Sequence, residues 1–214
     1  MKIKLKKKKN DSSNKWLTRH LNDEFYKKSK KDGFRSRASY KLIEINQKFQ
    51  IFKNCKFILD LGCSPGGWTQ VARRNSPKEC KILGIDKLDL KEIVGVKFIQ
   101  DDIFNEDIFN VINTFFNSNK VDLILNDMSP NSTGNKNIDH LRIVSLVERV
   151  LFIANNLLKK EGTIISKIFQ GGAQGDLLEF MKINFYSIKY YKPKASRKES
   201  SETYLIGKKN NKRK

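Results

Sequence analysis

The sequence has few residues of the types that build metal sites and disulfide frameworks. It contains three cysteines, Cys55, Cys63 and Cys80, and two histidines, His20 and His140. The cysteine spacings match no zinc motif, and an odd number of cysteines argues against a framework of disulfides. The two histidines lie far apart in the sequence, without cysteines beside them. We therefore expect no metal ion and reduced thiols, which are typical of an intracellular protein.

Long apolar runs are also missing. No run approaches the roughly 20 residues that a membrane-spanning helix needs. The lysines at the N-terminus are not followed by the apolar segment of a secretory signal. We therefore expect no membrane partner.

Acidic residues are scarce relative to basic ones. The chain has 23 Asp and Glu against 43 Lys and Arg, a formal net charge of +20. Such a balance favours a polyanionic partner, most often a nucleic acid, although a biased genome also enriches lysine. The charge is unevenly placed, because 14 of the first 40 residues are Lys or Arg and four are Asp or Glu. We expect a disordered basic segment over 1–15, one domain over 16–207 and a basic tail over 208–214.

Short apolar runs alternate with longer amphipathic stretches along this domain. Strands that alternate with helices predict an α/β, Rossmann-like fold, a mostly parallel seven-stranded sheet with helices on both faces. The last two runs are separated only by a loop rich in Pro, Ser and Lys, which predicts an antiparallel hairpin at one edge. The runs are 57–61, 82–85, 96–99, 121–125, 163–168, 186–190 and 203–206, and the amphipathic stretches include 68–75, 138–159 and 175–184.

A glycine-rich turn follows the first predicted strand. The strand ends near Asp60 and Gly62, and the chain then turns through 65–67 before a helix opens at Trp68. Glycine lets the backbone approach a ligand closely at the carboxyl end of such a strand. The second strand ends in Asp86, where a carboxylate can accept hydrogen bonds from the ribose of an adenosine. Asp102, after the third strand, is placed to meet an adenine amino group.

Two nucleotide cofactors compete for this turn. A dinucleotide site needs a Gly-x-Gly-x-x-Gly loop whose backbone N–H groups bind a pyrophosphate. Here Gly62 is followed by Ser64, and Pro65 has no N–H to donate. S-adenosylmethionine carries no phosphate, so the sequence favours it over a nicotinamide cofactor. A purely structural turn does not explain the acidic ends of the next two strands.

A lysine interrupts the fifth apolar run. Lys167 stands in Thr-Ile-Ile-Ser-Lys-Ile-Phe, where a charge is costly unless it is paired or functional. Asp127 follows the fourth strand, so both side chains are expected at the same edge of the sheet. Lys41 and Glu202 would complete a Lys–Asp–Lys–Glu cluster there. The alternative interpretation is a lysine that only neutralises a structural carboxylate.

These segments together resemble the FtsJ/RrmJ-type family of RNA 2′-O-ribose methyltransferases, and the resemblance extends from Ser13 to Gly207. Its motifs lie in 15–17, 25–26, 33–42, 60–68, 95–102, 126–131, 167–171 and 196–204. The resemblance implies a catalytic tetrad of Lys41, Asp127, Lys167 and Glu202. With the turn described above, it implies that S-adenosylmethionine is bound by Gly62, Ser64, Pro65, Gly66, Gly67, Trp68, Asp86, Asp102 and Asp127.

The sequence departs from the family pattern at two positions and leaves one role with two candidates. Ser64 stands where alanine is usual, and Asp101 replaces a glycine, so Asp101 competes with Asp102 for the adenine. Glu199 is a rival to Glu202, which fits the register of the motif better. As a base, Lys167 would need a lowered pKa to accept the proton of a ribose 2′-hydroxyl. Alternatively, it orients the attacking oxygen while positioning provides the rate.

The resemblance is strongest to the branch that methylates a uridine ribose in large-subunit ribosomal RNA. Transfer RNA methylation, messenger RNA cap methylation and a non-catalytic role in ribosome assembly are the alternatives. The partner is then RNA, bound by a monomer in the cytoplasm or in a ribosome-bearing organelle such as the mitochondrion. Basic side chains near Lys41 and Glu202 are expected to bind RNA phosphates. They are Lys27, Lys28, Lys30, Lys31, Arg35, Arg37, Arg197 and Lys198.

Overall fold

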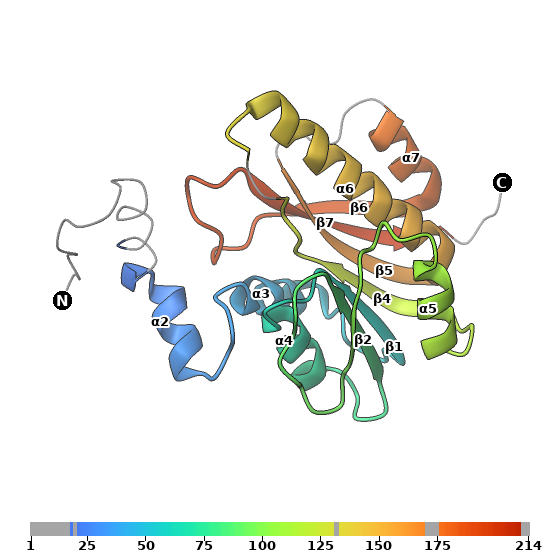
Figure 1. Ribbon diagram of the computed structural model, residues 1–214, viewed down its shortest axis with the longest axis horizontal. Coiled ribbons are helices and arrows are strands. Elements are labelled where there is room, and N and C mark those ends of the chain that lie inside the picture. Colours follow the sequence, from blue (N-terminus) through green and yellow to red (C-terminus); the bar gives the residue numbers. More distant parts are fainter. Residues whose placement is uncertain (1–17, 19–20, 131–132, 170–175, 211–214) are drawn as a thin grey trace.

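The computed structural model describes residues 18, 21–130, 133–169 and 176–210 (Figure 1). The predicted disordered segment 1–15 and the end of the basic tail lie outside these residues. No helix within the described part is both long and apolar enough to cross a membrane.

One seven-stranded sheet, in the order β3-β2-β1-β4-β5-β7-β6, forms the centre of the described chain. All strands run parallel except β7, which is antiparallel to both of its neighbours, β5 and β6. The predicted parallel sheet with an antiparallel hairpin at one edge is therefore confirmed. The strands are β1 (Phe57–Leu61), β2 (Lys81–Asp86), β3 (Lys97–Gln100), β4 (Val121–Asn126), β5 (Leu158–Phe169), β6 (Phe185–Tyr191) and β7 (Glu202–Lys209).

Helices cover both faces of this sheet (Figure 1). Alternate residues of β4 show the division, because Ile124 belongs to one hydrophobic core and Leu123 and Leu125 belong to the other. The core of Ile124 packs against α5, α6 and α7, and the core of Leu123 packs against α3 and α4. The helices are α2 (Glu24–Lys31), α3 (Ser39–Phe49), α4 (Gly67–Asn75), α5 (Ile108–Phe115), α6 (Lys136–Leu157) and α7 (Asp176–Asn184).

The structure differs from the sequence-based expectation mainly at the ends of elements. The helix α5, whose Ile108 and Ile112 are buried, was not predicted. The stretch 138–159 was expected to be one amphipathic unit, but α6 ends at Leu157 and β5 begins at Leu158, which pairs with Val121 of β4. β7 continues to Lys209, beyond the predicted limit of the domain, because Lys209 pairs with Phe185 of β6. β5 and β7 continue through polar residues because their backbones remain paired there. A search for apolar runs therefore misses these ends of the strands.

Candidate active site

The carboxyl end of β5 brings Lys167 to Asp127, the first residue after β4. The Lys167 ammonium lies 2.9 Å from the Asp127 carboxylate and donates a hydrogen bond of 2.7 Å to the Asp127 carbonyl. Its side chain is only 8% exposed, so the charge that interrupts the apolar run is paired inside the protein. The expected convergence of these two residues is present in the structure.

A second ion pair lies at the same edge of the sheet. The Lys41 ammonium, on the first turn of α3, is 2.8 Å from the Glu202 carboxylate. Glu202 begins β7, and because β7 is antiparallel to β5, its first residue pairs with Phe169 at the end of β5. The structure thus places Glu202, and not the exposed Glu199, beside Lys41.

Tyr204 joins the two ion pairs and was given no role from the sequence. Its hydroxyl donates a 2.6 Å hydrogen bond to the Asp127 carboxylate. The Lys41 ammonium lies 5.6 Å from the centre of its ring, and the Trp68 ring packs against it with 5.5 Å between ring centres. Tyr204 pairs directly with Lys167 in the β5–β7 ladder. Tyr204 stands within the motif that contains Glu202, but the sequence does not show that β7 pairs with β5. Without that pairing, its contact with the two ion pairs could not be predicted.

The two ammonium groups control the charge of Asp127. Burial alone raises the pKa of this carboxyl, but the charges of Lys167 and Lys41 and the Tyr204 hydrogen bond outweigh burial and leave the pKa below its usual value. Burial and the adjacent Asp127 raise the pKa of Tyr204 well above 10. Asp127 is therefore an anion and Tyr204 a neutral hydrogen-bond donor at neutral pH.

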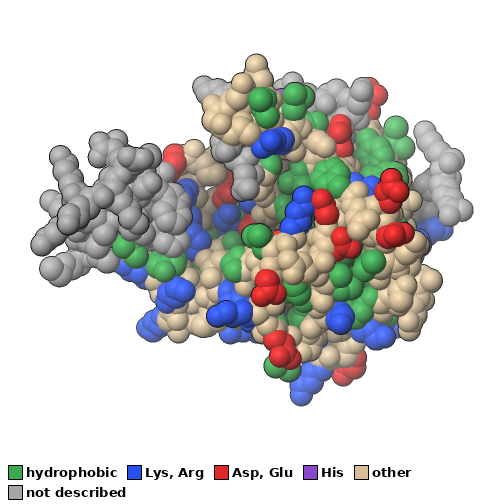
Figure 2. Space-filling view, viewed as in Figure 1, with side chains coloured by type: hydrophobic (Ala, Val, Ile, Leu, Met, Phe, Trp, Pro, Cys, Tyr) green, Lys and Arg blue, Asp and Glu red, His purple; other side chains and the backbone are tan. Residues whose placement is uncertain are grey.

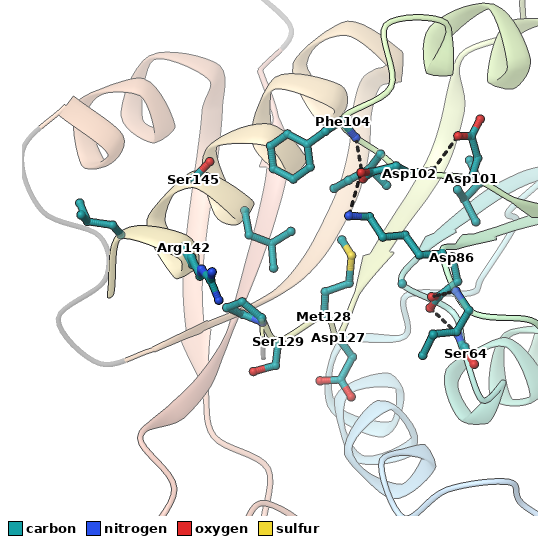
Figure 3. Close-up of a pocket in the computed structure, with 18 residues that line it drawn as sticks. Ser64, Asp86, Asp101, Asp102, Phe104, Asp127, Met128, Ser129, Arg142 and Ser145 are labelled. Atoms are coloured by element: carbon teal, nitrogen blue, oxygen red, sulfur yellow. Dashed lines mark hydrogen bonds and ion pairs between the residues drawn. The ribbon is translucent and has the colours of Figure 1, made fainter. Parts of the chain in front are cut away.

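A pocket of about 780 Å³ opens beside this cluster, at the carboxyl ends of β1, β2 and β4 (Figure 3). Asp127 lies at one end of the pocket and Asp86 lies across it. Both oxygens of Asp86 accept backbone hydrogen bonds of 2.8 Å, from Ser64 and from Leu88. Each carboxylate oxygen has a second lone pair, so Asp86 keeps acceptor capacity toward a ligand. Of the nine predicted cofactor residues, five line the pocket: Gly62, Ser64, Asp86, Asp102 and Asp127.

The other four predicted cofactor residues shape the loop behind the pocket and are not among its lining residues. Gly66 has φ +106° and is the N-cap of α4. Gly67 passes close to Ser36 and Ser39, and the Trp68 indole donates a 2.9 Å hydrogen bond to the Ala38 carbonyl. With Pro65, these residues fix the turn after β1 against α3.

Asp101 and Asp102 both border the pocket, but their carboxylates have different surroundings. Asp101 accepts hydrogen bonds from the Asp102 N–H and the Asn105 amide. Asp102 accepts from the Phe104 N–H and lies 2.7 Å from the Lys87 ammonium. In Figure 3 the Asp102 carboxylate points toward Phe104 and the pocket, whereas that of Asp101 points away from Met128. Asp102 is therefore the better placed of the two for an adenine amino group.

Further walls of the pocket were not recognised in the sequence. Gly62 has φ +71°, and a Cβ at this position would overlap the Met128 side chain, which lines the pocket. Across the pocket, Arg142 points from α6 toward Ser129 (Figure 3). The amphipathic pattern of α6 predicted a helix but did not show that its first turns border a ligand site. The additional lining residues on α6 are Leu141, Arg142, Ser145 and Leu146.

The chemistry of the pocket fits S-adenosylmethionine. Its carboxylates suit a ligand with an ammonium, a sulfonium and an adenine amino group, and Ile85, Leu88 and Phe104 provide apolar surface for a ring. Within the described residues, no group of three His, Cys, Asp or Glu side chains is arranged to hold a metal ion.

The predicted RNA-binding side chains fall into two groups. The lysines of α2 and Lys198 are exposed, and Figure 2 shows blue side chains gathered on the left-hand part of the face, over α2 and α4. The three arginines instead contact the protein itself. Arg35 donates to the carbonyls of Lys91 and Glu92, and both Arg37 and Arg197 pair with Asp23. A role for either group in RNA binding stays a prediction.

Comparison with known proteins identifies relatives along nearly the whole chain. The family model described as FtsJ-like methyltransferase matches residues 34–210. Proteins named ribosomal RNA large subunit methyltransferase E are similar to it. The one from Rickettsia akari is 42% identical over 96% of this chain and 92% of the relative, and the one from a Wolbachia of Brugia malayi is 47% identical over 92% and 88%. A crystal structure described as a ribosomal RNA methyltransferase from Plasmodium falciparum has a TM-score of 0.74 and 33% identity, and the match covers 84% of this chain and all of the other.

Proposed function

Because the chain belongs to the FtsJ-like methyltransferase family, we propose that it methylates a ribose 2′-hydroxyl of large-subunit ribosomal RNA, on a uridine. The observation that carries the proposal is the cluster of two ion pairs, Lys41–Glu202 and Lys167–Asp127, beside the pocket. The relatives' printed names support the large ribosomal subunit as the source of the RNA. We further propose that S-adenosylmethionine occupies the pocket and that the chain acts as a monomer. The bacterial relatives support the cytoplasm as its compartment.

S-adenosylmethionine, when bound, supplies an electrophilic methyl group on a sulfonium. The chain's residues would hold the ribose hydroxyl in line with this methyl group, and the hydroxyl proton would pass to a neutral Lys167 amine or, where Lys167 is an ammonium, to water. We assign the contact with the attacking oxygen to Lys167, because its ammonium lies beside Asp127, which lines the pocket. As an ammonium it donates a hydrogen bond that orients the oxygen, and as a neutral amine it accepts the proton.

The other three residues hold this geometry. Asp127 fixes the Lys167 ammonium through its carboxylate and its carbonyl, so the lysine has one defined position at the edge of the sheet. Glu202 fixes Lys41 through its carboxylate alone, and Lys41 contributes a second positive charge near the reacting oxygen. The low exposure of these four side chains, 8–16%, strengthens both interactions.

The proposed substrate is tested by incubation with labelled S-adenosylmethionine. Large ribosomal subunits, naked ribosomal RNA and transfer RNA are offered in parallel, and the modified nucleotide is mapped by its resistance to alkaline hydrolysis. We expect a single 2′-O-methyluridine in large-subunit RNA. Methylation of transfer RNA alone would contradict the ribosomal assignment, and failure to methylate any RNA would favour an assembly factor.

Lys167→Met tests the catalytic role, because methionine keeps much of the side-chain length and removes the charge. We expect methyl transfer to fall by at least about 1,000-fold, as for removal of other groups that act on the reacting atoms. The dissociation constant for S-adenosylmethionine, measured by calorimetry, should change by less than about threefold. Lys182→Met on the exposed surface of α7 is the matched control. A Lys167→Met protein with near-normal turnover would remove Lys167 from the mechanism.

A further inference from the structure

A second hollow lies at the opposite end of the sheet from the pocket. It measures about 430 Å³ and is bordered by the amino-terminal ends of β4 and β5 and by the end of β7. We call it the lysine groove, after four exposed lysines that line it from four different segments: Lys48 of α3, Lys53 of the following loop, Lys189 of β6 and Lys208 of β7. Lys159 of β5 is a fifth lining lysine.

The acidic residues of the groove are already engaged. The Asp122 carboxylate accepts hydrogen bonds from the backbone N–H groups of Lys56 and Phe57 and pairs with Lys159. Glu161 accepts a 2.5 Å hydrogen bond from the Tyr186 hydroxyl. Lys159 therefore has a structural role. Glu161 keeps its charge because its partner is a neutral phenol, but five lysines face two acids, so the groove stays net positive.

The four exposed lysines form no ion pair within the part of the chain that the structure describes. Two of them lie over aromatic rings, with the Lys48 ammonium 4.6 Å from the centre of Tyr191 and the Lys189 ammonium 5.9 Å from that of Phe49. Like charges that share one hollow repel each other and do not help folding. An anion in the groove would convert this repulsion into attraction.

Resting on the proposed function, we propose that the lysine groove binds backbone phosphates of the substrate RNA, as a second contact away from the methylated ribose. Lysines recognise phosphate as point charges and carry no sequence information, which suits a contact that only positions the RNA. The four lysines come from separate segments of the chain, so the fold brings them together and no single basic stretch of sequence forms the site. The Phe49 and Tyr191 rings, which pack against each other, hold the Lys48 and Lys189 ammonium groups at the groove.

The strand β7 sets the distance between this contact and the active site. Glu202 begins the strand and Lys208 lies six residues later, so at about 3.3 Å per residue the two ends are roughly 20 Å apart. This is farther than one nucleotide extends. The proposed contact therefore requires an RNA of several nucleotides that passes along the β6 edge of the sheet, or a folded RNA that presents two strands.

The test compares two triple variants of equal charge. Lys48, Lys53 and Lys208 are changed to Gln together, and the control changes Lys78, Lys81 and Lys97 to Gln at the other edge of the sheet, where all three are exposed. Affinity for a fragment of large-subunit ribosomal RNA is measured by fluorescence anisotropy over a range of salt concentrations. We expect the groove variant to bind at least about tenfold more weakly, with a salt slope smaller by about two, because each lost phosphate contact removes 0.7–0.9 from that slope. The control variant should bind within about twofold of the native chain.

Two further measurements separate the possible outcomes. An unchanged dissociation constant for S-adenosylmethionine confirms that the groove variant is folded, and loss of RNA binding is then due to the groove. Equal RNA affinity of groove and control variants would overturn the proposal. In that case, thermal unfolding with pyrophosphate shows what the groove does bind. Stabilisation of the native chain but not of the groove variant would mean that the groove binds a free anion and not RNA. Native protein that binds RNA through the groove without methylating it would contradict the proposed function alone.

Discussion

Tyr204 couples the two halves of the catalytic cluster. Its hydroxyl donates to Asp127, and its ring lies near the Lys41 ammonium and packs against Trp68. A hydrogen bond to a charged partner contributes more than one between neutral groups. Tyr204 is therefore a positioning residue that acts on the reaction through Asp127.

Tyr204→Phe removes this hydrogen bond and keeps the ring. The pKa of Asp127 should rise toward its usual value, because one of the interactions that lower it is lost. We expect the acidic limb of the pH–rate profile to move to higher pH, with a loss of about 1.5 kcal/mol in the free energy of unfolding. Tyr190→Phe, at an exposed position of β6, is the control. An unchanged acidic limb would show that Tyr204 does not act through Asp127.

Asp60 is the most completely buried acid of the pocket region. Its side chain is 1% exposed and accepts a 2.6 Å hydrogen bond from Thr69. Burial raises the pKa of Asp60 to about 7, although the Thr69 hydrogen bond opposes the rise. In the unfolded chain the pKa is about 4. The folded state therefore binds the proton more tightly, and this stabilisation is present below about pH 4 and lost as the pH rises through about 7.

Asp60→Asn removes the titration and retains an oxygen for Thr69. Relative to this variant, the native chain should lose stability between about pH 4 and pH 7, by at most about 1.4 kcal/mol for each pH unit. Denaturant unfolding at pH 5 and at pH 8 measures the difference. A difference between the two proteins that is the same at both pH values would contradict the raised pKa.

Single residues differ in how far their sequence reveals their role. Lys167 was recognisable because a lysine in an apolar strand needs a partner, and Glu202 because it fits a motif. Tyr204 was not recognisable as a link, since it faces Lys167 only through the pairing of β5 with β7. Arg35 was expected to bind RNA, but it donates hydrogen bonds to backbone carbonyls of a loop that is distant in sequence. No local pattern in the sequence indicates this contact.

At the scale of elements, Asp23 joins three segments next to the active site. It is the N-cap of α2, pairs with Arg37 at 3.1 Å and lies 3.6 Å from Arg197 in the loop between β6 and β7. Arg37 also donates to the Ala195 carbonyl of that loop. The loop ends at Glu202, so the position of this acid depends on contacts made by α2 and α3.

Asp23→Asn keeps the cap oxygen and removes the charge between the two arginines. We expect faster tryptic cleavage after Arg197 and Lys198, by several-fold, because the loop loses one of its attachments. Thermal unfolding should also shift to lower temperature, because the Asp23 side chain is only 9% exposed and its charge is the partner of two largely buried arginines. Asp89→Asn, in the exposed loop after β2, serves as the comparison. Identical cleavage rates in the two variants would show that Asp23 does not hold the loop.

The elements themselves were largely predictable, and their limits were less so. The seven apolar runs correspond to the seven strands of the described chain because buried parallel strands are almost continuously apolar. The order of the last two strands, with β7 between β5 and β6, depends on long-range pairing. The groove formed at the ends of β4, β5 and β7 follows from that order and has no local signal.

On the scale of the whole molecule, the charge of +20 should dominate how the protein meets RNA. We expect the logarithm of the RNA affinity to fall linearly with the logarithm of the salt concentration, as counterions are released from phosphates. Titrations between 50 and 300 mM KCl measure this slope. Binding of an uncharged S-adenosylmethionine analogue is the control, because its affinity should not depend on the salt concentration. An RNA affinity independent of salt would mean that the basic surface is not used.

The reversed direction of β7 has a consequence for how the chain tolerates changes in length. Inserted residues before Glu202 would enlarge a surface loop and leave the acid opposite Phe169. One residue inserted between Glu202 and Tyr204 would shift the alternation of side chains, so that the acid or the phenol would turn to the wrong side of the sheet. The sheet therefore tolerates a change of length only in the part of the loop that lies outside its contacts with Asp23, Arg37 and Glu44, and not between Glu202 and Tyr204.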